Sequence, residues 1–341
     1  MRVDEGFSWT ATGAELSAPV VLLKRVLATV APAVGAALAC LLLLPGATRA
    51  QQERAVAITI DDLPYVGGPQ ELARASHVAD GMLAALCAAG APAHGFVTGK
   101  RVLVEDEVDE RIELLRRWRD TGARLENHGW SHRSFHDTPF DEYVDDVARG
   151  GLFPEFLAAE VGDSVGFYRH PFNHTGSSLA VRRAFEAWLV ERGMKLAPFT
   201  VEHADYVFNA LYLEAERRGD EDRKARIVEA YLDQLDTAFA FAERLSVDTF
   251  GREIPQVFLI HANALNGAVL DRMVERLRSR GYRFVSLEKA LADPAYRTED
   301  LYVGRTGISW LHRWRVGLGL PDRLREAPDP PGWVLEAYRA R

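Results

Sequence analysis

The sequence is poor in cysteine, with only two in 341 residues. Cys40 lies in an apolar amino-terminal stretch, so removal of that stretch would leave Cys87 as the one remaining cysteine. A single cysteine cannot form an intramolecular disulfide, which excludes a disulfide-stapled fold. Cys87 lies in a helical pattern of small residues, and we expect it to be a buried core residue.

Long runs of Lys or Arg are also absent. The 41 Lys and Arg residues against 49 Asp and Glu residues give a formal net charge of -8. This balance argues against a nucleic-acid partner, and an acidic surface mainly promotes solubility. The chain has no internal repeat, linker or low-complexity block, and its length is compatible with one large α/β domain.

The amino terminus has the pattern of a secretion signal. Lys24 and Arg25 precede a long apolar run, and the triplet that ends at Ala50 resembles a small-residue cleavage site. We therefore expect residues 1–50 to be a signal peptide and residues 51–341 to form the mature, secreted or periplasmic protein. The alternative is an uncleaved membrane anchor, because the apolar run is nearly long enough to span a bilayer.

Short apolar runs alternate with amphipathic helical patterns along the mature chain. The predicted strands cover residues 55–60, 93–99, 123–128, 164–171, 194–201, 255–263 and 282–287. Repeated alternation of this kind favours a parallel sheet with helical crossovers. Seven such units predict an α/β fold with a closed or nearly closed (β/α)7-type barrel rather than an open sheet.

Two segments do not belong to the simple alternation. Residues 208–246, between the fifth and sixth strands, predict a helical insertion that either shapes one side of a groove or forms a solvated helical pair. The tail, residues 301–341, is rich in Trp and Pro, and we expect a structural cap rather than a substrate lid.

Polar residues follow the predicted strands at their carboxyl ends. They are Asp61 and Asp62 after the first strand, His128 and His132 after the third, Arg169 at the end of the fourth, Asp205 past the fifth and His261 at the end of the sixth. The carboxyl ends of the strands of a parallel barrel converge on one face, where active sites are built. The sequence therefore predicts one site made of these residues.

Asp62, His128 and His132 form a candidate metal site. Two imidazoles and a carboxylate suit Zn²⁺ with an open position for water. The four-residue spacing of the histidines is a weak signal by itself, and two exposed loop histidines are the alternative. The neighbouring Asp61 could accept a proton from the water, although two successive aspartates after a strand are also a common start of a helix.

His261 ends an apolar strand, where a protonated imidazole could donate a proton to a leaving group. Asp205 could orient this imidazole and raise its pKa. The alternative is a structural histidine held by hydrogen bonds.

These residues lie in motifs that resemble a known family. In order along the chain the motifs are "TIDDLP", "HGWSH", "RHPF", "EHADY" and "LIHA". They are similar to those of the polysaccharide deacetylases, also called the NodB-homology group or carbohydrate esterase family four. The resemblance runs from about residue 55 to residue 287 and implies a NodB-like distorted (β/α) barrel.

The resemblance implies a role for each site residue. Asp62, His128 and His132 would hold one divalent metal ion, Zn²⁺ or alternatively Co²⁺. Asp61 would be the base and His261 the acid, with Arg169 holding Asp61 and Asp205 orienting His261. The backbone N–H of Phe172 would stabilise the oxyanion. Tyr206 stands in the motif where the family has a Trp that walls the acetyl pocket, and Gly129 replaces the usual Ser or Thr between the histidines.

The implied reaction is hydrolysis of an N-acetyl or O-acetyl group of a glycan, with release of acetate. The expected partner is an acetylated glycan, and a membrane is a partner only if the amino-terminal segment is uncleaved. Two alternatives stay open: a metal-dependent hydrolase of another non-peptide amide, and a non-catalytic glycan-binding barrel.

Overall fold

The computed structural model describes residues 54–67 and 71–341, so the predicted signal peptide lies outside the described residues. Within them, seven strands form a single sheet. The strands are β1 Arg54–Leu63, β2 Ala93–Val97, β3 Arg124–Asn127, β4 Phe167–Tyr168, β5 Lys195–Leu196, β6 Gln256–His261 and β7 Tyr282–Phe284.

The sheet is parallel throughout, in the order β5-β4-β3-β2-β1-β6, with β7 paired to the start of β1. The segment after β5 closes the sheet on the other side. Val201 bridges Phe258 of β6, and the N–H of Leu259 donates to the Val201 carbonyl at 2.9 Å. The predicted distorted barrel of parallel strands is confirmed, and its closure runs through an irregular segment rather than a regular strand.

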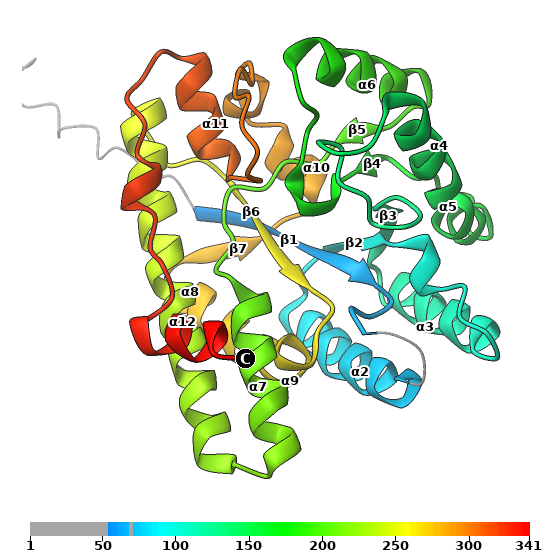
Figure 1. Cartoon of the computed structure of the whole chain (residues 1–341), viewed down its shortest axis with the longest axis vertical. Coiled ribbons are helices and arrows are strands. Elements are labelled where there is room, and N and C mark those ends of the chain that lie inside the picture. Colours follow the sequence, from blue (N-terminus) through cyan, green and yellow to red (C-terminus); the bar gives the residue numbers. More distant parts are fainter. Residues whose placement is uncertain (1–53, 68–70) are drawn as a thin grey trace, which may run out of the picture. The chain divides into compact units, whose positions relative to one another are not determined.

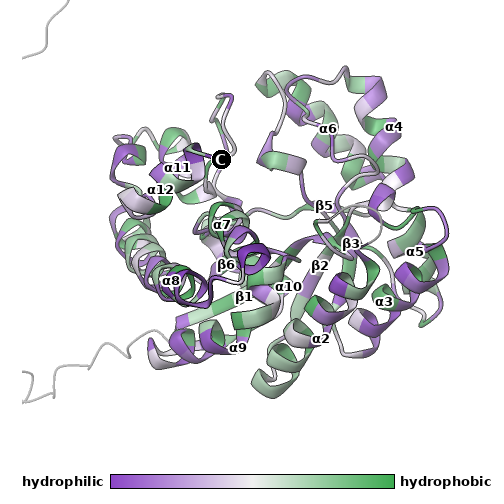
Figure 2. Cartoon of the chain, turned by 60° about the horizontal axis from the view of Figure 1, so that its bottom comes forward, coloured by the Kyte–Doolittle hydropathy of each residue, from purple (hydrophilic) through white to green (hydrophobic). Residues whose placement is uncertain are grey.

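Helices surround the sheet (Figure 1). They are α2 Leu72–Ala89, α3 Val108–Asp120, α4 Phe140–Gly150, α5 Leu152–Ala159, α6 Leu179–Glu191, α7 Asp205–Arg218, α8 Glu221–Phe250, α9 Ala264–Ser279, α10 Leu287–Leu291, α11 Trp310–Gly317 and α12 Gly332–Arg339. Figure 2 shows hydrophobic residues along the central strands and hydrophilic ones on the outer sides of the helices. The central strands β1 and β6 are buried along almost their whole length, as expected where helices cover one face and the barrel interior the other.

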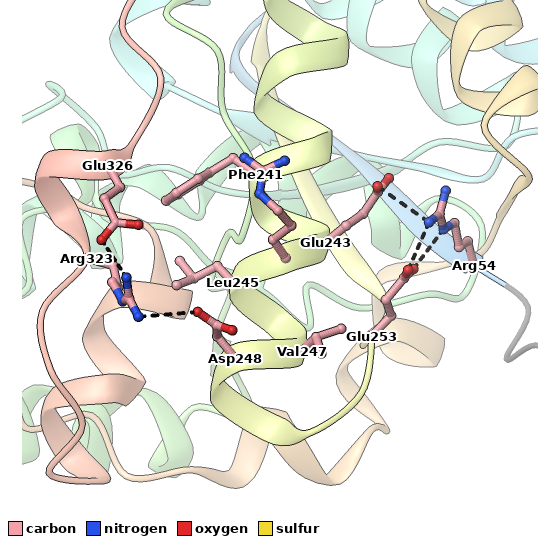
Figure 3. A pocket seen from close by; sticks show the side chains of 10 residues that line it. Arg54, Phe241, Glu243, Leu245, Val247, Asp248, Glu253, Arg323 and Glu326 are labelled. Carbon is pink, nitrogen blue, oxygen red and sulfur yellow. Dashed lines mark hydrogen bonds and ion pairs between the residues drawn. The ribbon is translucent and has the colours of Figure 1, made fainter.

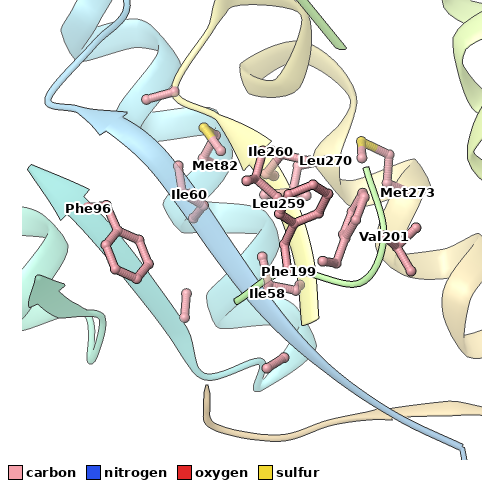
Figure 4. Close-up of a cluster of buried hydrophobic side chains, with 14 of the residues drawn as sticks. Ile58, Ile60, Met82, Phe96, Phe199, Val201, Leu259, Ile260, Leu270 and Met273 are labelled. Carbon is pink, nitrogen blue, oxygen red and sulfur yellow. The ribbon is translucent and has the colours of Figure 1, made fainter. Parts of the chain in front are cut away.

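The core is densest around β1 and β6. Every residue of β1 after Arg54 is buried. Figure 4 shows Ile58 of β1, Leu259 of β6 and the closing residues Phe199 and Val201 in one cluster. This packing holds β1 and β6 in register, which places the ends of both strands at the same level.

Helices α2 and α9 approach each other through glycines. A Cβ atom on Gly81 would lie 2.1 Å from the carbonyl oxygen of Gly267, so only glycine fits there. The apolar side of α2, including Val78 and Met82, faces this contact and the sheet. Cys87 lies on the other side of the helix and is exposed, so the prediction that it is buried is wrong. Because small residues surround Cys87, the sequence pattern did not indicate which side of the helix packs against the core.

Two predicted strands are much shorter than expected. The fourth, predicted over residues 164–171, has two residues, because Pro171 lacks an N–H and Phe172 adopts φ +57°. The fifth, predicted over 194–201, also has two, and Pro198 interrupts it.

The helical pattern over residues 140–160 is two helices, α4 and α5, that meet at Gly150 and Gly151. The predicted insertion is a pair of helices, α7 and α8, which extends beyond residues 208–246 at both ends. Tyr231 and Phe239 of α8 are fully buried, and the Phe239 ring lies 5.1 Å from that of Phe258 in β6. The pair is therefore part of the wall around the barrel, not a solvated appendage.

Candidate active site

Two acidic side chains of the site come from the end of β1. Asp61 is paired with His261 across β1 and β6, so the two residues lie at the same level of the sheet. Successive residues of a regular strand point to opposite faces. Asp62, however, has φ +68°, and the pairing of β1 with β2 shifts between Ile60 and Leu63. An irregularity of this kind re-aims side chains next to active sites.

Asp62, His128 and His132 form the metal group predicted from the sequence. One ligand atom from each lies within 4.8 Å of the other two. Nδ1 of His128 hydrogen-bonds to the Arg169 carbonyl at 2.9 Å, which fixes the proton on Nδ1 and leaves Nε2 as a ligand atom. Burial lowers the pKa of His132 to about 4, so its imidazole is neutral near pH 7. This donor set fits a divalent ion such as Zn²⁺.

The loop between the two histidines is braced from α4. Asp146 accepts hydrogen bonds from the N–H groups of Trp130, at 2.9 Å, and Ser131, at 3.2 Å. Gly129 has φ +77°, and Gly150 packs so closely that a Cβ on it would lie 2.3 Å from the Gly129 carbonyl carbon. Gly129 therefore serves the close approach of α4, and Asp146 braces the loop through its backbone N–H groups.

Asp62 has two further partners that the sequence analysis did not identify. Arg101 donates from Nε to Oδ1 at 3.1 Å and from Nη2 to Oδ2 at 3.2 Å, and Thr98 donates to Oδ1 at 3.0 Å. Burial opposes ionisation, but Arg101, then His132 and His128, hold the pKa of Asp62 well below its usual range. A carboxylate has about four lone-pair positions, so these contacts leave room for an ion.

The positions of Arg101 and Thr98 in the sequence could have identified them as site residues. Both follow the end of β2, at the same edge of the sheet as the predicted site residues.

Asp61 is held by Arg169. The guanidinium donates from Nη1 to Asp61 Oδ1 at 2.9 Å and to the Thr59 hydroxyl at 2.7 Å. Arg169 is fully buried, with its guanidinium carbon 4.4 Å from the centre of the Phe96 ring. Oδ2 of Asp61 lies 3.8 Å from Nε2 of His128. The carboxylate thus has one oxygen bound by Arg169 and the other turned toward the metal group.

His261 is held by Asp205, the first residue of α7. Both the backbone N–H and Nδ1 of His261 hydrogen-bond to the carboxylate at 2.8 Å. Asn263 and Asn266 donate to the same carboxylate at 3.0 and 2.7 Å. Burial opposes the imidazolium, but Asp205 outweighs it and raises the pKa of His261 to about 10. His261 in turn lowers the pKa of Asp205 to about 2, again against burial.

Of the two residues predicted to contact substrate, one lies beside the metal group. The Phe172 ring is 53% exposed and stands edge-on to His132, with ring centres 4.5 Å apart. Tyr206 is also exposed, but its ring lies against Tyr338 of α12 at 6.2 Å. The structure therefore brings Phe172 to the site, whereas no contact of Tyr206 with the metal group is found.

A cavity of 790 Å³ adjoins the metal group. Thr98, Arg101, Ser131 and His132 line its side toward the group. A second cavity, of 510 Å³, lies at the amino-terminal ends of the strands, where Arg54 begins β1 (Figure 3). Several of its charged groups form ion pairs with one another. These pairs join Arg54 to Glu243 and Glu253, and Arg323 to Asp248 and Glu326. The cavity next to the metal group is the candidate substrate site because His132, a residue of that group, lines it.

Comparison with protein families matches residues 48–180 to the family described as polysaccharide deacetylase. The matched segment contains the metal group and the Asp61–Arg169 pair. This part of the chain belongs to the polysaccharide deacetylase family. Asp205 and His261 lie outside the matched residues. His261 reaches the candidate site through the pairing of β6 with β1, and Asp205 reaches it through its hydrogen bond to His261. Comparison with the curated proteins finds no match.

Several solved structures are similar to this chain. One is a CE4 family pseudoenzyme from Bacillus anthracis, at 15% identity and a TM-score of 0.48, covering 71% of this chain and 66% of that one. Another is the peptidoglycan deacetylase PdaC from Bacillus subtilis, at 20% identity and a TM-score of 0.45. The match covers 71% of this chain and 93% of that one. A third is the family 4 carbohydrate esterase from Streptomyces lividans, at 20% identity and a TM-score of 0.44. The match covers 71% of this chain and 97% of that one.

Proposed function

We propose that the chain is a metal-dependent polysaccharide deacetylase that hydrolyses an N-acetyl or O-acetyl group of a glycan and releases acetate. The family match supports a hydrolase that acts on acetyl amides or esters. One observation carries the finer proposal. The Asp62–His128–His132 group lies beside Asp61, which Arg169 holds, while His261, held by Asp205, is paired with Asp61 across the sheet.

Asp62, His128 and His132 would hold the ion. A divalent cation bound there polarises the acetyl carbonyl and acidifies a water molecule. The neutral imidazole of His132 and the ionised carboxylate of Asp62 are the forms that bind metal, so neither of these two ligands need release a proton at neutral pH to bind the ion.

Asp61 acts as the general base. Because Arg169 occupies Oδ1, Oδ2 accepts the proton of water as its oxygen adds to the acetyl carbon. The backbone N–H of Phe172, on the loop beside His132, donates to the oxyanion that forms.

His261 acts as the general acid. Asp205 keeps its imidazole protonated at neutral pH, so a proton is available for the leaving group. This proton passes to the sugar amine or hydroxyl as the bond to the acetyl carbon breaks, which leaves acetate and the deacetylated sugar. The pairing of His261 with Asp61 puts acid and base at the same level, where one acetyl group can lie within reach of both.

The test is to compare wild-type protein, Asp61→Asn and the double variant H128A/H132A. Wild type and Asp61→Asn should each bind about one divalent ion per chain by elemental analysis, and the double variant should bind none. Acetate release from acetylated oligosaccharides should fall by roughly 10²- to 10⁴-fold in Asp61→Asn, the usual range for loss of a general base. Full activity in Asp61→Asn would show that Asp61 is not the base, and metal-free wild type would refute metal dependence.

Secretion is part of the proposal. Residues 1–50 have the pattern of a signal peptide, and they lie outside the described residues. In the part of the chain that the structure describes, no helix is both long and apolar enough to cross a membrane. Amino-terminal sequencing of exported protein should begin near Gln51, whereas membrane-bound protein that retains residues 1–50 would favour the anchor.

A further inference from the structure

The carboxyl-terminal tail touches the loop that carries the proposed oxyanion donor. A Cβ atom on Gly307 would lie 1.9 Å from the carbonyl oxygen of Phe172 and 2.8 Å from Cβ of Asn173. The tail backbone and the Phe172 peptide are therefore in direct contact, with no space for a methyl group. Phe172 lies within the matched residues 48–180, whereas Gly307 is 127 positions beyond residue 180.

The loop on the other side of this contact has an unusual conformation. Phe172 and Asn173 have φ values of +57° and +55°, in the left-handed region that residues with a side chain rarely adopt. Such a conformation persists where the surrounding structure imposes it. The close contact with Gly307 is one such constraint, because it blocks movement of the Phe172 carbonyl toward the tail.

The tail is anchored on the side of the Phe172 loop. Arg313 donates to Asp300 Oδ2, at 2.8 Å from Nε, and to the Thr175 hydroxyl at 2.6 Å. Arg182 of α6 donates to the carbonyls of Asp300, at 3.0 Å, and Tyr302. Arg313 and Arg182 are both almost completely buried, so these contacts are shielded from water. The segment before Gly307 is thus fixed to the loop that follows Phe172.

The tail is also anchored to the segment that closes the barrel. The Ser309 hydroxyl donates to the Thr200 carbonyl at 2.7 Å, and the N–H of Trp310 donates to the Phe199 carbonyl at 3.0 Å. Gly307 therefore lies in a span with both ends fixed, one to the Phe172 loop and one to the strand segment that leads to Asp205. Figure 1 shows this orange part of the chain next to α11.

We propose that Gly307 is a positioning residue for the reaction: by packing against the Phe172 carbonyl, it fixes the backbone conformation of Phe172 and so holds the Phe172 N–H, on the other side of the Phe172 Cα, where the oxyanion forms. The proposal rests on the deacetylase function proposed above. It makes the tail part of the catalytic apparatus, without any tail side chain touching the substrate.

The test uses two alanine variants of the whole chain. Gly307→Ala inserts a methyl group against Phe172. Gly317→Ala is the matched control, because its Cβ would lie 2.1 Å from the Glu299 carbonyl oxygen, a similar backbone clash that does not involve Phe172. Gly332→Ala, with no atom within 4 Å of the added Cβ, is the neutral control.

Gly307→Ala should lower kcat about 100-fold, the lower end of the range for loss of one oxyanion donor, with KM within about twofold of wild type. Gly317→Ala should lower the melting temperature as much as Gly307→Ala does and leave kcat unchanged. Amide hydrogen exchange over residues 171–175 should become faster in Gly307→Ala alone. This exchange measurement reports on the contact between tail and loop whether or not the reaction is the one proposed.

The outcomes separate the two proposals. Wild-type protein that releases no acetate from any acetylated glycan overturns the proposed function, and the positioning role falls with it. Active wild type with unchanged kcat in Gly307→Ala overturns only the positioning role. Equal losses of kcat in Gly307→Ala and Gly317→Ala also overturn it, because they would reflect general loosening of the tail.

Discussion

Replacing Asp205 with Asn tests the electrostatic support of His261. Oδ2 of Asp205 receives hydrogen bonds from the His261 backbone N–H and from the side chains of Asn263 and Asn266. In the variant, the amide oxygen must face these three donors. The amide N–H then points at Nδ1 of His261 and requires it to be an acceptor. The substitution therefore removes the negative charge and also favours a neutral imidazole.

The expected change follows from the pKa of His261. Asp205 raises it to about 10, against 6.5 for an ordinary imidazole. At about 1.4 kcal/mol per pKa unit, the difference corresponds to at most roughly 5 kcal/mol in favour of the imidazolium. Burial disfavours the charge and is unchanged in the variant, so we expect the variant pKa at or below about 6.5. At pH 8, wild type is then almost fully protonated at His261, and roughly one variant molecule in thirty or fewer is.

The assay is the pH dependence of kcat/KM for acetate release between about pH 6 and pH 10.5. Activity that needs a protonated His261 should fall in wild type only as the pH approaches 10 and in Asp205→Asn from about pH 6.5. Because the folded-state pKa is raised, the ion pair stabilises the fold fully below pH 6.5 and loses this effect as the pH rises through about 10. Urea unfolding at pH 7 and pH 10 should show this loss in wild type and not in the variant.

The matched control is Asn263→Ser. It removes one amide donor from Asp205 but keeps the carboxylate charge, and serine still caps α9. In Asn263→Ser, the fall of kcat/KM at alkaline pH should occur within about half a pH unit of the fall in wild type. The assignment of His261 as an acid kept protonated by the Asp205 charge would be refuted in either of two cases. The pH at which kcat/KM falls could be unchanged in Asp205→Asn, or it could shift equally in the control.

Two further substitutions test other contacts. Arg101→Gln removes a positive charge that contacts Asp62, so affinity for Zn²⁺ by isothermal titration calorimetry should rise at least about tenfold; equal or weaker binding would mean that Arg101 mainly orients the ligand. Gly81→Val forces a side chain against the Gly267 carbonyl, so the free energy of unfolding in urea should fall by about 3 kcal/mol. A loss no larger than that of Gly332→Ala would refute the close α2–α9 contact.

The barrel and most of the site could be predicted because their signals are local. Alternation of apolar runs with amphipathic helices indicates parallel strands joined by helices. Polar residues directly after these strands must then meet at one edge of the sheet. Asp61 and His261 illustrate this, since they are 200 positions apart in the chain and lie paired at the ends of adjacent strands. The metal hypothesis rested on the types of Asp62, His128 and His132, on their place after strands and on the resemblance of their motifs to a known family.

Other features were mispredicted where a local pattern fits two structures. The small-residue pattern around Cys87 is compatible with either side of α2 facing the core, and packing against α9 decided it. The pattern over residues 140–160 is helical throughout, and the break at Gly150 follows from its contact with Gly129.

The sequence by itself determined the class of fold, the ligand types and the order of the motifs, because each depends on residues close together in the chain. Only the tertiary structure decided what holds the site in place. The contacts of Arg101 with Asp62, Asp146 with the histidine loop and Gly307 with Phe172 join segments that no local pattern connects. Such contacts depend on the register of strands and on the distance between backbones, and both are set only when the whole barrel packs.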